Sequence, residues 1–191
     1  ADIYVVVKRT VGGSAKYYIE MFDDQRTTDA NIQYFSGATA PDQAKPSNTT
    51  CSSLSHLEAK TVDVVRDNFV LTDKTVASGA ITIDAVPSTF VEVGLPYSVE
   101  VKTLPAEPKL PSGVVVSRKR RILEATPVLD RTQNITVNGF EVALETLPFT
   151  MGSVPTTFTG RKRVAPLLGY SDTAQLTFTQ TQPLFATVLG V

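Results

Sequence analysis

The chain has 191 residues, of which 42% are hydrophobic and 19% are charged, and its formal net charge is −1. This composition is typical of a globular protein, and the chain is long enough to bury a hydrophobic core without disulfides or structural metals. No apolar run approaches the ~20 residues of a membrane helix, and the near-neutral charge argues against general affinity for nucleic acid or anionic membrane.

The first predicted element is a β-hairpin. Residues 3–10 and 15–22 are strand-like, and they are joined by a turn that contains Gly12 and Gly13. Two glycines permit positive φ at both central positions of a tight turn. The sequence therefore predicts two antiparallel strands at the start of the chain.

Residues 23–53 lose this periodicity and are rich in Asp, Thr, Ser, Ala, Asn and Pro. Within them, residues 32–35 are apolar enough for one short strand, and the rest is predicted to be a long loop. A loop of this length in a compact domain is usually functional or is ordered by a neighbour.

The next stretch, residues 54–101, is predicted to be a small antiparallel β module made of short strands and tight turns. Residues 60–66 alternate, with Val62 and Val64 on one face, so we expect a half-buried strand. Asp67 and Asn68 tolerate a left-handed backbone and favour a reversal of the chain. Further strands are predicted at 69–71, 80–84, 89–93 and 97–102.

Residues 104–112 contain three prolines, which is typical of an extended connector. We place a boundary within it, with one module at residues 1–108 and a second at 109–191. The second module contains a long β-favouring run at 114–130, a further strand at 173–179 and a hairpin at Asn138 and Gly139. No segment has a convincing helical stripe, so the fold class predicted is mainly β, with two small sandwich- or barrel-like antiparallel modules and almost no helix.

Both ends of the chain also carry strand-like sequence, and it begins with Ala rather than Met. Natural termini usually fray into polar tails. We therefore expect this chain to be a segment of a longer polypeptide.

One run of motifs resembles a known family. In order it reads HLE-x-K-T-V-x-V, an Asp-led hairpin, V-x-x-G-A-I-T-I and V-x-V-G-L-P-Y-x-x-x-V-x-T-L-P. This order is similar to a cassette in bacteriophage tail nozzle proteins, also called tail tubular protein B or phage stabilisation protein. The similarity extends to VVVKRTVGGSAKYYIE at 5–20, RKRRI at 118–122, LPF at 147–149 and FTGRKRV at 158–164. The chain departs from the pattern at Ala59 and Asn68, where glycine is usual.

The resemblance implies a structural component of a short-tailed virion, with no catalytic site and no cofactor. Such a protein assembles as a ring below the portal and adaptor and helps to close the channel that retains DNA until ejection. Its implied partners are other copies of itself, the adaptor and tail fibre, and, transiently, the genomic DNA, but no membrane. Two alternatives stay open: a receptor- or glycan-binding tail domain, and a hydrolase that degrades cell wall or capsule.

Few residues suggest catalysis or metal binding. His56 is the one histidine of the chain and Cys51 the one cysteine, so a multi-histidine metal site and an internal disulfide are both excluded. With Glu58 nearby, a mixed metal site is conceivable, but a polar structural role is the better interpretation. No G-x-S-x-G motif surrounds the hydroxyl-rich residues 49–53.

Carboxylates matter because some phage tail proteins degrade glycans, and glycosidases need two carboxyl groups about 5–10 Å apart. Asp23 with Asp24, and Glu92 with Glu100, are the pairs considered. The chain has no tryptophan to serve as a sugar platform. We expect no hydrolytic activity.

Two basic clusters are the candidate site residues. We expect them to pair with acidic residues across strands or between subunits, or to contact DNA in the tail channel. Charge reversal at Arg120 and Arg121 is expected to block ring assembly without unfolding the protein. The candidate subunit-interface or channel contacts are Arg118, Lys119, Arg120, Arg121, Arg161, Lys162 and Arg163.

Overall fold

The structure is a computed structural model of the chain. It describes residues 2–36, 49–84, 89–106, 109–110, 113–114, 119–144, 156–165, 167 and 169–191. The chain divides into two compact units, Ala1–Tyr97 and Ser98–Val191. We describe each unit by itself.

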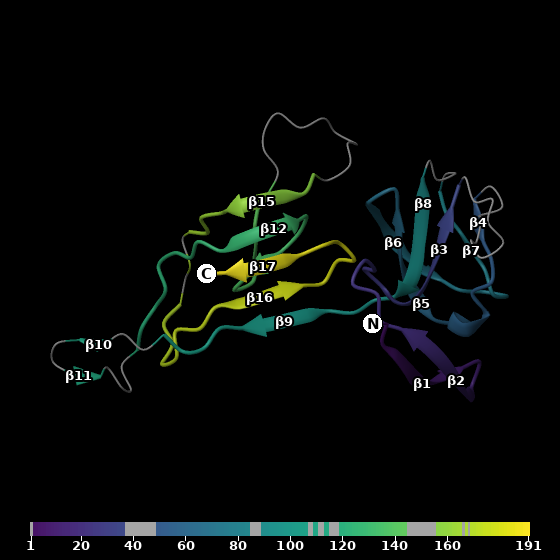
Figure 1. The fold of residues 1–191 in the computed structure, drawn as a ribbon, viewed down its shortest axis with the longest axis horizontal. Helices are drawn as coiled ribbons and strands as arrows, with labels where there is room; N and C mark the ends of the chain where they lie inside the picture. The colour runs from purple at the N-terminus through teal and green to yellow at the C-terminus, as the bar shows by residue number, and fades with distance from the viewer. Residues whose placement is uncertain are drawn as a thin grey trace. The chain divides into compact units, whose positions relative to one another are not determined.

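The first unit is built around a four-stranded antiparallel sheet (Figure 1). One face carries a core that includes Tyr34, Val62, Val64, Val91 and Val93. The strands lie in the order β3 (Asp29–Phe35), β8 (Phe90–Leu95), β5 (Thr61–Arg66) and β6 (Phe69–Thr75).

Strand β5 is buried on both faces, which differs from the half-buried strand that the sequence predicts. Val62 and Val64 lie in the core, but Asp63 and Val65 on the other face are also buried. β5 is also an inner strand of the sheet, with β8 paired along one edge and β6 along the other. Alternation in the sequence reports one buried face and does not show that the second is covered.

Two smaller sheets complete this unit. Strands β1 (Tyr4–Val11) and β2 (Ser14–Met21) form the predicted hairpin, with φ of 56° at Gly12 and 79° at Gly13. Strands β4 (Thr50–Cys51) and β7 (Ile81–Thr82) form the other. The short strand predicted at 32–35 is part of β3, which begins earlier, at Asp29, and β4 is a second strand in the segment predicted to be mostly loop. Residues 37–48 of that segment lie outside the described residues.

The second unit has two antiparallel sheets that share one core, a sandwich-like arrangement. The core includes Leu129 from the three-stranded sheet and Val137 and Phe178 from the four-stranded one. The first sheet has the order β15 (Phe158–Arg161), β12 (Val128–Thr132) and β17 (Thr187–Gly190). The second has the order β14 (Phe140–Glu141), β13 (Thr136–Val137), β16 (Thr177–Gln180) and β9 (Val99–Lys102).

Strand β9 belongs to this second unit, whereas the predicted boundary at residue 108 assigns it to the first. It is hydrogen-bonded to β16 over four residue pairs, from Val99 with Gln180 to Lys102 with Thr177. The predicted connector contributes β10 (Lys109–Leu110), which pairs with β11 (Gly113–Val114). In the run at 114–130, the described part beyond residue 118 has two isolated bridges, at Arg120 and Ala125, before β12 begins.

The fold class is mainly β, as predicted from the sequence. In the described residues the helical content is one 3-10 turn, η1 (Ser55–Leu57). No helix in this part of the chain has the length and apolar character to cross a membrane.

Candidate functional site

The first basic cluster is held in place by Arg120. Its backbone N–H donates to Ser171 O at 2.8 Å, and the Ser171 N–H donates back to Arg120 O at 2.8 Å. Its guanidinium donates to the backbone carbonyls of Asp172, at 2.9 Å, and Ala106. Arg120 therefore joins three separate backbone segments of the second unit, and its role in this unit is structural.

The neighbouring Arg121 points the other way and is exposed. Its guanidinium lies over the ring of Tyr170, 5.5 Å from the ring centroid. An arginine stacked on an exposed aromatic ring gains about 0.5–1 kcal/mol and is kept in one orientation.

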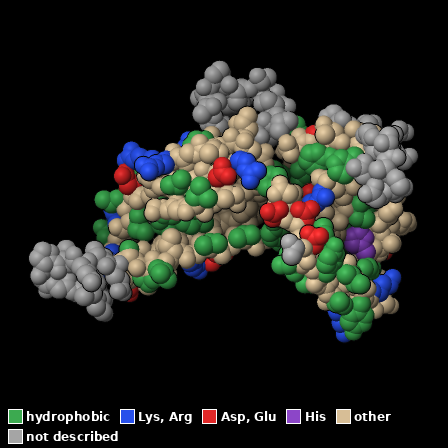
Figure 2. Space-filling view, in the orientation of Figure 1, with side chains coloured by type: hydrophobic (Ala, Val, Ile, Leu, Met, Phe, Trp, Pro, Cys, Tyr) green, Lys and Arg blue, Asp and Glu red, His purple; other side chains and the backbone are tan. Residues whose placement is uncertain are grey.

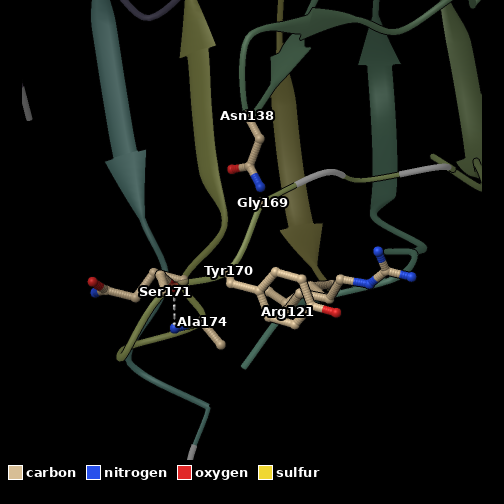
Figure 3. Close-up of a pocket in the computed structure, with 8 residues that line it drawn as sticks. Arg121, Asn138, Gly169, Tyr170, Ser171 and Ala174 are labelled. Carbon is tan, nitrogen blue, oxygen red and sulfur yellow. Dashed lines mark hydrogen bonds between the residues drawn. The ribbon is translucent and has the colours of Figure 1, made fainter. Parts of the chain in front are cut away.

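Arg121 and Tyr170 form one side of an open pocket of about 220 Å³ (Figure 3). Asn138 lies at the opposite end of it, in the hairpin turn between β13 and β14, with a φ of 49°. Asn138 Oδ1 accepts a hydrogen bond from Thr177 N–H at 2.8 Å, which leaves its NH₂ group as a donor toward the pocket. The lining residues are Arg121, Ile122, Asn138, Gly169, Tyr170, Ser171, Ala174 and Gln175.

The chemistry of this pocket favours a ligand with acceptor groups. A guanidinium, a primary amide and a tyrosine present mainly N–H and O–H donors beside an aromatic edge. Ser171 Oγ accepts from Ala174 N–H at 2.7 Å and keeps its own O–H as a further donor. A carboxylate or a hydroxyl-rich group is the type of ligand that such donors bind.

The remaining members of the two clusters are dispersed over the second unit. Arg163 forms an ion pair with Glu124 at 2.5 Å, and both side chains are largely exposed. Lys162 lies over the ring of Phe158 at 5.7 Å. Lys119 and Arg161 are exposed and form no ion pair with another described residue. Arg118 lies outside the described residues.

Cys51, His56 and Glu58 are not brought together into a reactive site. Burial raises the pKa of the Cys51 thiol to about 11, which keeps it protonated. A ring nitrogen of His56 is 2.9 Å from Ala30 O, and its ring packs edge-on against Tyr18. In the part of the chain that the structure describes, no group of three or more ligand-type residues is arranged to hold a metal ion.

Glu58 instead bridges two parts of the motif cassette. Its two carboxylate oxygens accept hydrogen bonds from Ser78 N–H at 3.0 Å and Gly79 N–H at 2.7 Å. Ser78 and Gly79 form the turn before β7, with φ of 52° and 68°. The acidic residue of the HLE motif therefore fixes the turn of the V-x-x-G-A motif.

The carboxylates considered for glycan hydrolysis are also bound within the fold. Glu92 is buried, and its Oε1 accepts four hydrogen bonds, from the N–H and hydroxyl groups of Thr27 and Thr28, at 2.8–3.1 Å. Asp23 accepts from Gln25 N–H and pairs with Arg26. The Gln25 N–H, more than Arg26, lowers the pKa of Asp23. Glu100 lies in the other unit from Glu92 and pairs with Lys102 at 2.8 Å.

The sequence predicts Arg121 as a contact residue but does not predict Tyr170 and Asn138 as its neighbours in the pocket. It indicates Asn138 only as a turn residue, and no motif surrounds Tyr170. No sequence signal could have linked the three, because they come from segments far apart in the chain that only the packing of the second unit brings together.

Comparisons with known proteins give no family assignment. No protein-family model matches this chain, and no curated protein matches it either.

Proposed function

We propose that this chain is a structural part of the tail nozzle of a short-tailed phage. In this role it assembles with other copies in a ring and helps to form or close the channel through which DNA is ejected. The role is not catalytic and uses no cofactor. Its place is the virion tail, below the portal and adaptor, with the adaptor and the tail fibre as partners.

The main support is the way in which the motif residues that carry the resemblance are used. Glu58 binds the Ser78–Gly79 turn, Leu57 lies in the core, and His56 contacts β3 at Ala30. The polar groups of the cassette therefore stabilise its architecture and leave no described cluster of reactive groups in this unit. That arrangement is expected of a protein whose task is to keep a shape.

Labelling of intact virions tests the proposal. An antibody raised against this chain, detected with gold particles in electron micrographs of the phage that encodes it, should bind at the tail below the portal. A matched antibody against the capsid protein should label the head only. Absence of the chain from purified virions, measured by mass spectrometry, would contradict the proposal.

The pocket around Arg121 and Tyr170 favours a second candidate function, recognition of a receptor glycan. Its donors and its aromatic side are suited to a saccharide that carries a carboxylate. A glycan array with the parent chain and with Arg121→Ala and Tyr170→Ala decides between the two. Saturable binding that both substitutions abolish would favour receptor recognition over the structural role. An array without binding would favour the structural role.

A further inference from the structure

The β1–β2 hairpin has one face that no described part of its own unit covers. Tyr4 pairs with Met21, Val6 with Ile19 and Lys8 with Tyr17, and cross-strand partners point to the same side of a sheet. On this open face five apolar side chains are exposed by 50% to 78%: Tyr4, Val6, Tyr17, Ile19 and Met21. Figure 2 shows hydrophobic side chains gathered over the hairpin.

The opposite face is fixed to the rest of the first unit. Arg9 forms a double hydrogen bond with Glu20 at 2.8 Å and also pairs with Asp29 of β3. Tyr18 contacts the ring of His56. Because the ion pairs and Tyr18 hold this face inward, the hairpin cannot turn to bury its apolar face without breaking them.

The open face is large enough for a specific contact. A tyrosine side chain covers about 150–250 Å², and valine, isoleucine and methionine cover somewhat less. At their exposed fractions the two tyrosines and three aliphatic side chains together present on the order of 600 Å². This is at the upper end of the largest apolar patch on a typical monomer. It also approaches the ~800 Å² that each partner contributes to a standard interface.

A matching apolar surface exists on the second unit at strand β9. This strand is at the edge of its sheet, and all four of its residues are exposed. Val99 and Val101 point to one side of it, exposed by 43% and 57%, and Leu104 follows at 86%. An exposed apolar edge strand is a surface that soluble proteins normally cover or pair.

We propose that the open face of the hairpin docks on strand β9 of a second copy of this chain. Such a contact joins two different patches, which is the interface type that builds a closed ring. The inference rests on the proposed function for the ring, but it predicts association of the chain itself. Failure to associate would overturn this contact and would leave the virion-labelling result unaffected.

The test is sedimentation of the 191-residue chain over a range of concentrations. The parent should show weak, reversible association. Ile19→Lys on the hairpin and Val101→Lys on β9 should each raise the dissociation constant about tenfold or more, because a charge is placed in the apolar centre of the contact. Leu123→Lys, at another exposed leucine of the second unit, is the matched control and should associate like the parent. Circular dichroism verifies that each variant is folded.

Mixing the two interface variants identifies the geometry. Ile19→Lys keeps an intact β9 surface, and Val101→Lys keeps an intact hairpin face. An equimolar mixture of the two variants should therefore recover one-to-one association. Three results would overturn the proposal. They are a parent that stays monomeric at millimolar concentration, loss of association in Ile19→Lys while Val101→Lys still associates, and an equimolar mixture of the two variants that does not associate. Binding of the parent to anionic vesicles, lost in Ile19→Lys, together with a monomeric parent, would assign the face to lipid instead.

Discussion

Arg120 and Arg121 are adjacent in the sequence but meet different surroundings. The guanidinium of Arg120 is partly buried and donates to two backbone carbonyls, with its Nε–H buried and without a hydrogen-bond partner among the described residues. Arg121 is exposed and stacks on Tyr170. A double charge reversal therefore does not report on assembly alone, contrary to the expectation from the sequence, because it also removes an internal anchor.

Single substitutions should separate the two roles. Arg120→Ala leaves the carbonyls of Ala106 and Asp172 without a donor, and we expect it to lower the free energy of unfolding by about 1–2 kcal/mol. Arg121→Ala removes one exposed contact and should cost less, about 0.5 kcal/mol, the lower end of the range for an exposed cation–π pair. Urea denaturation of both variants measures these changes. Equal destabilisation by the two substitutions would contradict the assignment of Arg120 as the anchor.

At the scale of elements, the tight turns are what the sequence predicts best. Positive φ is adopted at both residues of three such turns, each of which joins the two strands of a hairpin: Gly12–Gly13, Asp67–Asn68 and Asn138–Gly139. These residue types tolerate positive φ, so the local sequence is enough to predict the turn. Strand partners are predicted less well. Alternation in residues 97–102 suits either module, and only the pairing with β16 places β9 in the second unit.

The availability of the carboxylates considered for hydrolysis is the least predictable from the sequence, for a related reason. Glu92 and the two threonines that bind it are more than sixty residues apart in sequence, with separations of 64 and 65. Nothing local in the sequence distinguishes a carboxylate that is bound in this way from one that is free for catalysis. Long-range packing decides which polar groups stabilise the fold and which remain available.

Strand β5 carries a pH-dependent contact that follows from its burial on both faces. Asp63 lies beside Asp73 of β6, where the register between the two strands shifts. Burial first, and then Asp73, raises the pKa of Asp63 above its ordinary value of 3.8. The stability that protonated Asp63 contributes is therefore present below pH 3.8 and is lost as the pH rises through the higher pKa of the folded state.

Asp63→Asn should remove this dependence. The amide keeps the size and a donor toward Asp73 but carries no charge, so the variant should be more stable than the parent at pH 7. The difference should disappear as the pH falls below the ordinary carboxyl range. Thermal unfolding between pH 3 and pH 7 measures both effects, with Asp24→Asn as a control for the loss of one exposed carboxylate. A variant that is less stable at pH 7 would show that the charged form is favoured in the fold.

At the scale of the whole molecule, each unit has its own hydrophobic core and its own sheets. The second unit depends on β9 and the residues that follow it. Thr103 Oγ1 accepts from Leu176 N–H at 3.0 Å, and Thr103 O accepts from Gln175 Nε2 at 2.8 Å. A cut at residue 108 would remove these bonds, together with the strand that pairs with β16.

Two fragments test where the second unit begins. Residues 98–191 should fold and unfold cooperatively, whereas residues 109–191 should not. In the shorter fragment β16 keeps β13 but loses β9 on its other edge, and Phe178 loses its cross-strand neighbour Val101. Dispersion of amide signals in NMR spectra and the sharpness of thermal unfolding distinguish the two. If both fragments fold equally well, the second unit does not need β9, and the boundary predicted at residue 108 would be the better one.

The burial of Cys51 also means that its thiol can report when the first unit opens. The thiol is fully enclosed and is held protonated by its raised pKa, so a thiol-modifying reagent reacts only when the first unit opens. Cys51 is the single cysteine of the chain, so every labelling event comes from that unit. Labelling rates at increasing reagent concentration would give the frequency of opening of the first unit, without an engineered reporter and while the second unit remains intact.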